Sequence, residues 1–183
     1  MKTRILLLCS CLAALLVPSA CLGYPEGADP VKGFELQRYL GTWYEIARLD
    51  HSFERGLQEG TANYSMREDG GVRVLNRGYS PNKQEWSEAE GTAYFVREDD
   101  EGYLEVCFFW PFYGSYVVYD MDREEYEWAA VCSSNHSYLW LLSRKPYVSK
   151  DVKRRFLQRA KKLGFDTDAL IFVEHGKVKR IGG

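Results

Sequence analysis

Side chains that could act as nucleophiles, acid–base catalysts or metal ligands are few in this chain and widely separated. His51, His136 and His175 fall in a loop, in a hairpin turn and in the C-terminal segment. The sequence contains no Gly-x-Ser-x-Gly, no His-Glu-x-x-His, no Gly-rich phosphate loop and no Cys-x-x-Cys. We therefore expect the three histidines to be exposed surface residues, and we assign no catalytic residue, no metal ligand and no cofactor.

Two thiols, those of Cys107 and Cys132, belong to the part of the chain that is expected to fold. They fall on the fifth and seventh of the strands described below. Strands two apart in a sheet lie about 10 Å from each other, beyond the usual Cα separation of a disulfide. We expect two free and mostly buried thiols. Because Cys107 alternates with Phe108, it is expected to face outward.

A third thiol, that of Cys21, follows an N-terminal export signal. Lys2 and Arg4 form a short positive region, residues 5–17 are apolar, and small residues precede the cysteine. The apolar stretch is shorter than the roughly 20 residues that a membrane-spanning helix needs. We expect residues 1–20 to be a signal peptide, residues 21–33 to be a lipidated terminus and spacer, and residues 34–183 to form the folded domain.

The residues before Cys21 resemble the lipobox of bacterial lipoproteins, in which the cysteine thiol and the new amino group are acylated. The resemblance implies a lipid anchor, since several acyl chains hold a protein durably on a membrane. Leu22, rather than Asp, follows the cysteine, which for such lipoproteins implies the outer membrane and a domain facing the periplasm. Pro18 replaces the usual aliphatic residue, so the alternative is a secreted protein with an unmodified Cys21.

Composition and charge limit the class of partner. Without Lys2 and Arg4 the chain has 22 basic against 26 acidic side chains, a net charge of −4, so nucleic acid is not an expected partner. The remaining length suits one domain. Aromatic residues make up 15 % of the chain, which indicates large apolar faces, either in a dense core or around a cavity.

Eight short segments rich in β-branched and aromatic residues follow one another at hairpin spacing. Turn-forming clusters such as residues 68–71 and 99–102 separate them. The segments are 42–49, 60–68, 71–79, 84–97, 103–110, 115–121, 126–132 and 137–144. They predict an all-β fold, an antiparallel meander that is most economically closed into an eight-stranded up-and-down barrel. A barrel of this size can hold one small ligand.

One helix is expected to pack outside the barrel. Ser149 can cap a helix that runs to about Leu163, and Gly164 is placed to end it. Its apolar face comprises Val152, Phe156, Leu157, Ala160 and Leu163. We interpret its lysines and arginines as a solvated face, with contact to anionic lipid headgroups as the alternative. Residues 169–174 offer a short ninth strand.

Three motifs give the chain a family resemblance. Residues 41–48, with Phe34 and Tyr39 before them, resemble the first signature of the lipocalins, including the short 3₁₀ segment that closes the barrel floor. Residues 118–120 with Tyr126 resemble the second signature, and residues 139–144 the third. The resemblance covers roughly residues 31–175. Residues 63–65 and 108–114 make it closest to the bacterial outer-membrane lipoprotein lipocalins, which are apolipoprotein D-like.

Closure of the barrel would make the first and last strands neighbours, so we expect Arg144 to lie across the indole face of Trp43. Such a cation–π contact stabilises by about 0.5–2 kcal/mol. Both residues are interpreted as a structural barrel floor. Glu45 alternates with Trp43 and is expected to point inward into a hydrogen-bonded network, because a buried carboxylate without partners is costly. Contact between Glu45 and a ligand is the alternative.

Strand alternation predicts which side chains line the interior. The residues selected as ligand-binding are Tyr64, Met66, Val74, Asn76, Val106, Phe108, Tyr116, Val118, Trp128, Trp140 and Leu142. The same alternation turns Ala47, Ala62, Val72 and Ala130 inward. In the family, positions matching Tyr64, Asn76 and Trp140 line the pocket. Plain core packing is the alternative for any one of these residues, but as a set they describe an apolar tube suited to an acyl chain.

The resemblance implies a membrane-anchored protein that stores or transports fatty acids or lysophospholipids for envelope maintenance. The alternative is an enzyme acting on a lipophilic substrate inside the barrel, for which Cys107 is the candidate thiol. Haem carriage is a third possibility, but the sequence offers no convincing inward histidine. A homodimer is also considered, with Phe112 and Tyr113 beside Pro111 as its contact.

Overall fold

The computed structural model describes residues 22–178, so the predicted signal peptide and Cys21 lie outside the described residues. The elements follow in the order α1 (Leu36–Tyr39), β1 (Gly41–Arg48), β2 (Gln58–Met66), β3 (Val72–Ser80), β4 (Glu85–Phe95), β5 (Tyr103–Phe109), β6 (Phe112–Met121), β7 (Trp128–Cys132), β8 (Leu139–Ser143), α2 (Lys150–Lys162), the 3₁₀ turn η1 (Thr167–Ala169) and β9 (Ile171–Phe172). Each predicted strand is present within a few residues of its expected bounds.

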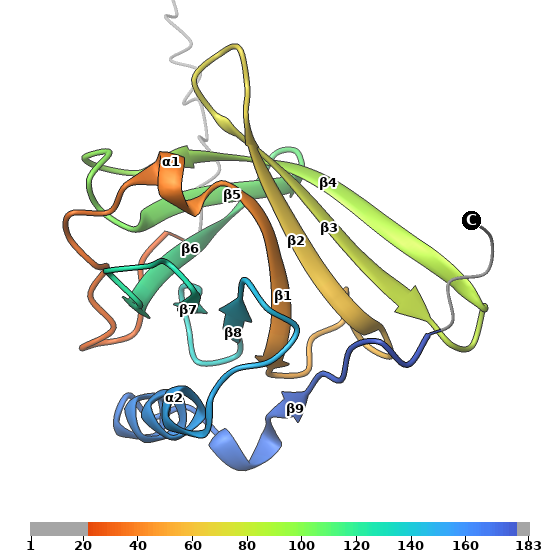
Figure 1. Cartoon of the computed structure of the whole chain (residues 1–183). Coiled ribbons are helices and arrows are strands. Elements are labelled where there is room, and N and C mark those ends of the chain that lie inside the picture. The colour runs from red at the N-terminus through yellow and green to blue at the C-terminus, as the bar shows by residue number, and fades with distance from the viewer. Residues whose placement is uncertain (1–21, 179–183) are drawn as a thin grey trace, which may run out of the picture.

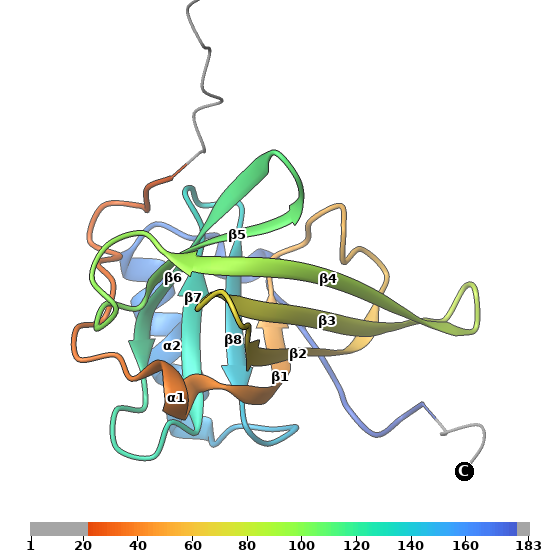
Figure 2. The ribbon, with the colours of Figure 1, turned by 90° about the horizontal axis from the view of Figure 1, so that it is seen from above.

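The strands form a closed antiparallel barrel (Figures 1 and 2). Each strand from β2 to β8 pairs with the next, and β1 pairs with both β8 and β2. The predicted eight-stranded up-and-down barrel, with one helix outside it and a short extra strand, is confirmed.

Strand β1 closes the ring by changing partner along its length. Residues 41–44 pair with β2, and residues 44–48 pair with β8, with a register shift between Glu45 and Ala47. Strand β9 pairs with β1 at Ala47 and Arg48, and Val173 N donates to the carbonyl of Ile46 at 2.9 Å. The C-terminal segment therefore lies beside the part of β1 that has parted from β2.

The buried apolar residues form two clusters, one on each side of the barrel wall. The interior cluster includes Trp43, Val118 and Leu142. The outer cluster includes Leu141 and Phe156, and it lies between the wall and α2. Strands β7 and β8 are thus buried on both faces. They lack the alternation of buried and exposed residues from which the sequence predicts which side chains point into the barrel.

Helix α2 forms and docks as the sequence predicts. The Ser149 hydroxyl accepts a hydrogen bond from Val152 N at its start, and Gly164 adopts the left-handed conformation (φ 86°) just past its end. Phe156 and Ala160 are buried in the outer cluster, and Figure 1 shows α2 beside the barrel. Of its basic side chains, Arg155 donates two hydrogen bonds to the buried carboxylate of Asp120, at 2.7 and 3.0 Å.

A layered stack fills the end of the barrel at which α1 lies. The guanidinium of Arg144 lies 3.9 Å from the centre of the Trp43 indole ring, which confirms the predicted contact. Arg144 also donates to the carbonyls of Thr42 and Arg38, at 3.0 and 2.7 Å. The Tyr39 ring also packs on this indole, with 4.6 Å between ring centres, and the indole N–H donates to the Tyr39 carbonyl at 2.8 Å.

The segment before the barrel is packed against it, whereas the sequence predicted a spacer. Ala28 and Val31 are buried, and Val31 N donates to the carbonyl of Val118 at 2.9 Å. Gly23 N donates to the Ser115 hydroxyl at 3.0 Å. The fold therefore includes residues well before Phe34.

Both described cysteines, Cys107 and Cys132, are free and buried, as predicted. Burial raises the pKa of the Cys132 thiol to about 12. Within residues 22–178, no helix is long and apolar enough to cross a membrane.

Replacing Arg144 with Ala tests the floor stack. The change removes a cation–π contact and two hydrogen bonds, so we expect the free energy of unfolding, measured by urea denaturation, to fall by about 2 kcal/mol. Arg154, an exposed arginine of α2, is the control, and Arg154→Ala should change it by less than about 0.5 kcal/mol. Equal losses for the two variants would show that the stack does not stabilise the barrel.

Candidate ligand-binding site

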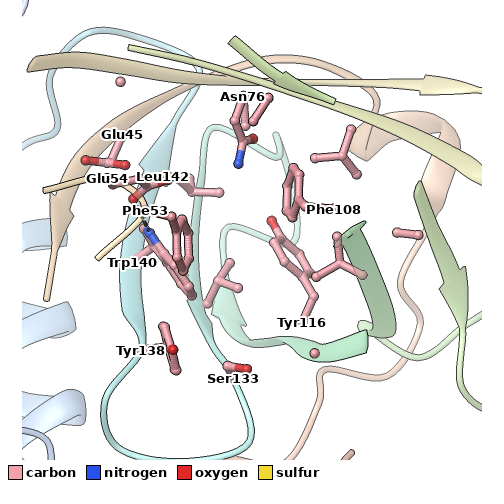
Figure 3. Close-up of a pocket in the computed structure, with 18 of the residues that line it drawn as sticks. Glu45, Phe53, Glu54, Asn76, Phe108, Tyr116, Ser133, Tyr138, Trp140 and Leu142 are labelled. Carbon is pink, nitrogen blue, oxygen red and sulfur yellow. Dashed lines mark hydrogen bonds between the residues drawn. The ribbon is translucent and has the colours of Figure 1, made fainter. Parts of the chain in front are cut away.

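The barrel encloses a cavity of about 650 Å³, within the range of roughly 300–1,000 Å³ that is usual for small-ligand pockets. Phe53, from the β1–β2 connection, and Ser133 and Tyr138, from the β7–β8 connection, line it together with the β5–β6 hairpin. The mouth is therefore at the end of the barrel opposite α1. Figure 3 shows the lining side chains converging on the space between the strands.

Three tyrosines form the floor of the cavity. The Tyr116 hydroxyl lies 2.8 Å from the hydroxyl of Tyr39 and 2.8 Å from that of Tyr64. Burial raises the pKa of all three well above the ordinary value for tyrosine, so they are neutral at physiological pH. Because their hydroxyls are paired with one another, the floor presents mainly ring carbon to a ligand.

Most of the residues predicted to bind a ligand face the cavity. Those that line it are Tyr64, Val74, Asn76, Val106, Phe108, Tyr116, Trp140 and Leu142, together with Ala62 and Val72. Figure 3 places Trp140 and Leu142 on one wall and Asn76, Phe108 and Tyr116 across from them. Alternation selected Val72, Val74 and Asn76 correctly because β3 pairs with β4 without any register shift.

Three predicted residues do not line the cavity, and each has a different reason. Met66 is the last residue of β2 and is exposed. Val118 is fully buried in the interior cluster, near Gly102 and Val31. Trp128 belongs to the outer cluster with α2, where Arg155 lies 5.1 Å from its ring centre.

The inward assignments of Trp128, Ala130 and Ala47 are wrong. Strand β7 is buried on both faces, so the positions of its apolar residues do not indicate which side chains face the cavity. In β1, the register shift after Glu45 turns Ala47 to the outer cluster and brings Arg48 to the cavity. A bulge of this kind reverses every later inward assignment on its strand.

A buried polar cluster stands on the β1 side of the cavity. Arg48 donates to the Glu45 carboxyl and, at 2.9 Å, to the carbonyl of Leu57. Glu54 accepts from the Trp140 indole N–H at 3.2 Å, and its Oε2 lies 3.0 Å from His51 Nε2. The expectation of a hydrogen-bonded network around an inward Glu45 is confirmed. Figure 3 shows Glu45, Glu54 and Trp140 together.

His51 is only 5 % exposed, so the prediction of an exposed side chain is wrong. Its ring stacks on Phe53 at 4.1 Å between ring centres and packs near Tyr138 and Trp140. The sequence placed it correctly in a loop, but that loop folds over the cavity mouth. His136 is exposed, as expected, and His175 is half-buried with its Nε2 lying 2.8 Å from the Glu45 carbonyl oxygen.

The two carboxyl groups of the cluster differ in proton affinity. Burial raises the pKa of Glu45 to about 8, and the negative charge of Glu54 adds to this, while Arg48 opposes it. Burial also acts to raise the pKa of Glu54, but the hydrogen bonds and charge of His51, Trp140 and Arg48 hold it below its usual range. At neutral pH Glu45 is thus largely protonated and Glu54 ionised.

Glycines make room for two of these side chains. A Cβ on Gly60 would lie 3.1 Å from Glu45 Oε2, and a Cβ on Gly91 would lie 2.8 Å from Cδ1 of the Phe108 ring. Gly60 lies on β2, next to the strand of Glu45, and Gly91 lies on β4, next to the strand of Phe108. Because glycine has no side chain, Glu45 and Phe108 can extend into the space beside them.

The comparison with known families agrees with this geometry. Residues 34–175 match the model of the lipocalin-like domain. The chain belongs to the lipocalin family. The resemblance predicted from the three sequence signatures is thereby confirmed.

Named relatives match most of the length of this lipocalin. It is 56 % identical over 174 residues to the outer membrane lipoprotein Blc of Vibrio cholerae, covering 95 % of this chain and 99 % of that one. It is 50 % identical over 150 residues to Blc of Escherichia coli K12, with 82 % and 84 % covered. Rat apolipoprotein D is more distant, at 32 % identity with 81 % and 82 % covered.

Solved structures support the fold alone. Insecticyanin from the tobacco hornworm superposes on this lipocalin with a TM-score of 0.64 at 19 % identity, over 85 % of this chain and 88 % of that one. At this identity the likeness concerns the barrel and not the contents of the cavity.

The sequence reasoning missed the lipocalin's loop residues at the cavity mouth. Phe53, Glu54, Ser133 and Tyr138 line the cavity from connections between strands, where alternation has no meaning. The available signal was the density of aromatic residues beside the strand ends, at residues 51–53 and 138–140.

Replacing Glu45 with Gln tests the proton affinity of the cluster. A carboxyl with a raised pKa binds its proton more tightly when folded, so its contribution to stability is present at low pH and is lost as the pH rises from about 4.5 to about 8. The wild-type lipocalin should therefore lose up to about 1.4 kcal/mol per pH unit in this interval relative to Glu45→Gln. Urea denaturation of both proteins from pH 5 to 8 measures the difference.

The exposed Glu127, which pairs with Lys145, provides the control. Glu127→Gln should keep the wild-type pH dependence between pH 5 and 8. If Glu45→Gln also keeps it, Glu45 is ionised across this range and the assigned proton is wrong.

Proposed function

We propose that this lipocalin binds a fatty acid or lysophospholipid in its barrel and stores or transports it for envelope maintenance. The observation that carries the proposal is the cavity of about 650 Å³, closed at its floor by paired tyrosines and walled by Val74, Val106 and Leu142. An apolar chain that enters it leaves water without separating buried polar groups from their partners.

The polar cluster supports a ligand that carries a polar group as well as a chain. Arg48 and Glu54 line the cavity, and Arg48 Nε is buried without a hydrogen-bond partner among residues 22–178. A buried donor without a partner is costly. A ligand oxygen placed near Arg48 would satisfy this donor while the chain extends toward the tyrosines.

We further propose that the protein is anchored in the outer membrane through an acylated Cys21 and faces the periplasm. The support is the signal-like sequence of residues 1–20, the cysteine that follows it, and two relatives named outer membrane lipoprotein. On this proposal residues 1–20 are removed, and the domain begins close to the anchor.

A binding role is favoured over the enzyme alternative. Cys107, the thiol considered as a nucleophile, alternates with the lining residues Val106 and Phe108 and is itself absent from the cavity lining. A nucleophile directed away from the cavity cannot attack a bound ligand.

The possible homodimer stays a prediction. Phe112 is exposed, whereas Tyr113 is half-buried and lines the cavity. Sedimentation velocity of the purified protein would test it directly.

Ligand binding is tested by filling the cavity. Adding a fatty acid to the wild-type protein should change tryptophan fluorescence saturably at about one ligand per barrel, since Trp140 lines the cavity. Val106→Trp places a large ring where the chain must lie, so its folded fraction should bind at least about tenfold more weakly, a loss of about 1.4 kcal/mol or more.

Thr92→Trp is the control for this substitution, because Thr92 lies between the inward Gly91 and Ala93 and is absent from the cavity lining. It should bind as the wild type does. Equal affinity of all three proteins would contradict binding in the barrel. Ligand turnover that disappears in Cys107→Ser would favour the enzyme instead.

The anchor is tested by Cys21→Ser. Without an acylated cysteine, the protein should move from the membrane fraction to the soluble periplasmic fraction, and its urea unfolding curve should not change. Membrane fractionation equal to that of the wild type would show that Cys21 is not the anchor.

A further inference from the structure

The β5–β6 hairpin carries an exposed aromatic tip. Phe109, Trp110 and Phe112 are 74 %, 78 % and 69 % exposed. The rings of Phe109 and Phe112 stack on each other at 6.4 Å between centres. Large aromatic residues exposed together in this way mark an interaction surface.

The tip is continuous with the cavity. Phe109 and Phe112 are exposed and also line the cavity, as does Phe53, which is 57 % exposed in the β1–β2 connection. These three residues and Trp110 are called the aromatic rim below. An apolar partner that covers the rim therefore meets the opening of the cavity.

The chain around the tip carries no charge. Residues 106–119 contain no Asp, Glu, Lys or Arg, and Glu105 and Asp120 bound this stretch. An uncharged tip that includes a tryptophan is suited to the interface between lipid headgroups and acyl chains, where an aromatic ring can be half-buried without desolvating a charge.

The N-terminal end of the described chain lies beside the same hairpin. Gly23 N donates to the hydroxyl of Ser115, which is three residues from Phe112 on β6 and so about 10 Å along the strand. A residue two positions before Gly23 can lie no farther than about 7 Å from it. Figure 2 shows the first described residues and the β5–β6 hairpin on the same side of the barrel.

We propose that the aromatic rim docks on a phospholipid bilayer, the one in which Cys21 is anchored, with Phe109, Trp110 and Phe112 inserted among the lipids. An anchor at Cys21 holds the hairpin within reach of the leaflet, and insertion of the tip turns the cavity mouth toward it. A lipid can then pass between leaflet and cavity with its chain covered. The inference goes beyond ligand binding and uses the proposed anchor for its orientation.

The first test uses the acylated protein reconstituted in vesicles whose phospholipids carry bromine on the acyl chains. Bromine quenches tryptophan fluorescence at short range, so the wild type should be quenched and Trp110→Phe should lose most of that quenching. Trp86→Phe is the matched control, because Trp86 is exposed on β4 and absent from the cavity lining. It should keep the quenching. Quenching that survives Trp110→Phe unchanged would overturn the proposal.

The second test removes the anchor. With Cys21→Ser as the starting protein, changing Phe109, Trp110 and Phe112 together to Ser should lower the partition coefficient onto phosphatidylethanolamine–phosphatidylglycerol vesicles at least about tenfold. Tyr147→Ser is the control, since Tyr147 is 66 % exposed between β8 and α2, away from the rim. It should partition as Cys21→Ser does. Equal partitioning of the triple variant would also overturn the proposal.

Two further measurements separate this proposal from its competitors. If sedimentation velocity shows that the triple variant dissociates a dimer and its vesicle partitioning is unchanged, the rim contacts a second copy and the membrane proposal is wrong. The fatty acid titration without vesicles reports on the cavity alone. Saturable binding there, together with failed docking, would reject the rim proposal and leave the proposed function standing.

Discussion

Closure of the sheet at β1 is the constraint on which the cavity depends. One strand must pair with β2 at its start and with β8 at its end, and the register shift after Glu45 accompanies that change of partner. A closed barrel pairs its backbone groups around the ring, so its interior can be apolar. The same shift brings Arg48 to the cavity, where it contacts Glu45. The geometry that closes the barrel thus also supplies the polar groups of the site.

One end of the barrel is closed by packed side chains and the other is open, so the cavity has a floor and a single mouth. At the α1 end, Arg144, Trp43 and Tyr39 stack in layers and the tyrosine hydroxyls pair with one another above them. At the other end, connections carrying Phe53 and Tyr138 stand around the opening. Aromatic residues therefore stabilise the floor by packing, while those at the mouth remain partly exposed and available to a partner.

Charge is placed so that the cavity remains close to neutral. Burial holds the proton on Glu45 near neutral pH, which leaves Glu54 ionised beside Arg48. A cavity without net charge suits a chain-like ligand better than one with two ionised carboxylates, because the single guanidinium of Arg48 can balance only one of them. The uncharged tip of the β5–β6 hairpin continues this apolar character to the outside of the molecule.

The sequence by itself determined the strands, the helix after them and the lining residues on regularly pleated strands, because hydrophobic period and turn chemistry are local properties. The contact between Trp43 and Arg144 followed from the barrel closure that the order of the strands and the family signatures implied. Tertiary structure alone decided the rest. Trp128 lies outside because α2 covers β7, and Ala47 lies outside because β1 changes register. His51 is buried because its loop folds over the mouth. Each of these depends on a segment distant in the chain or on a bulge, and the pattern of a single strand contains neither.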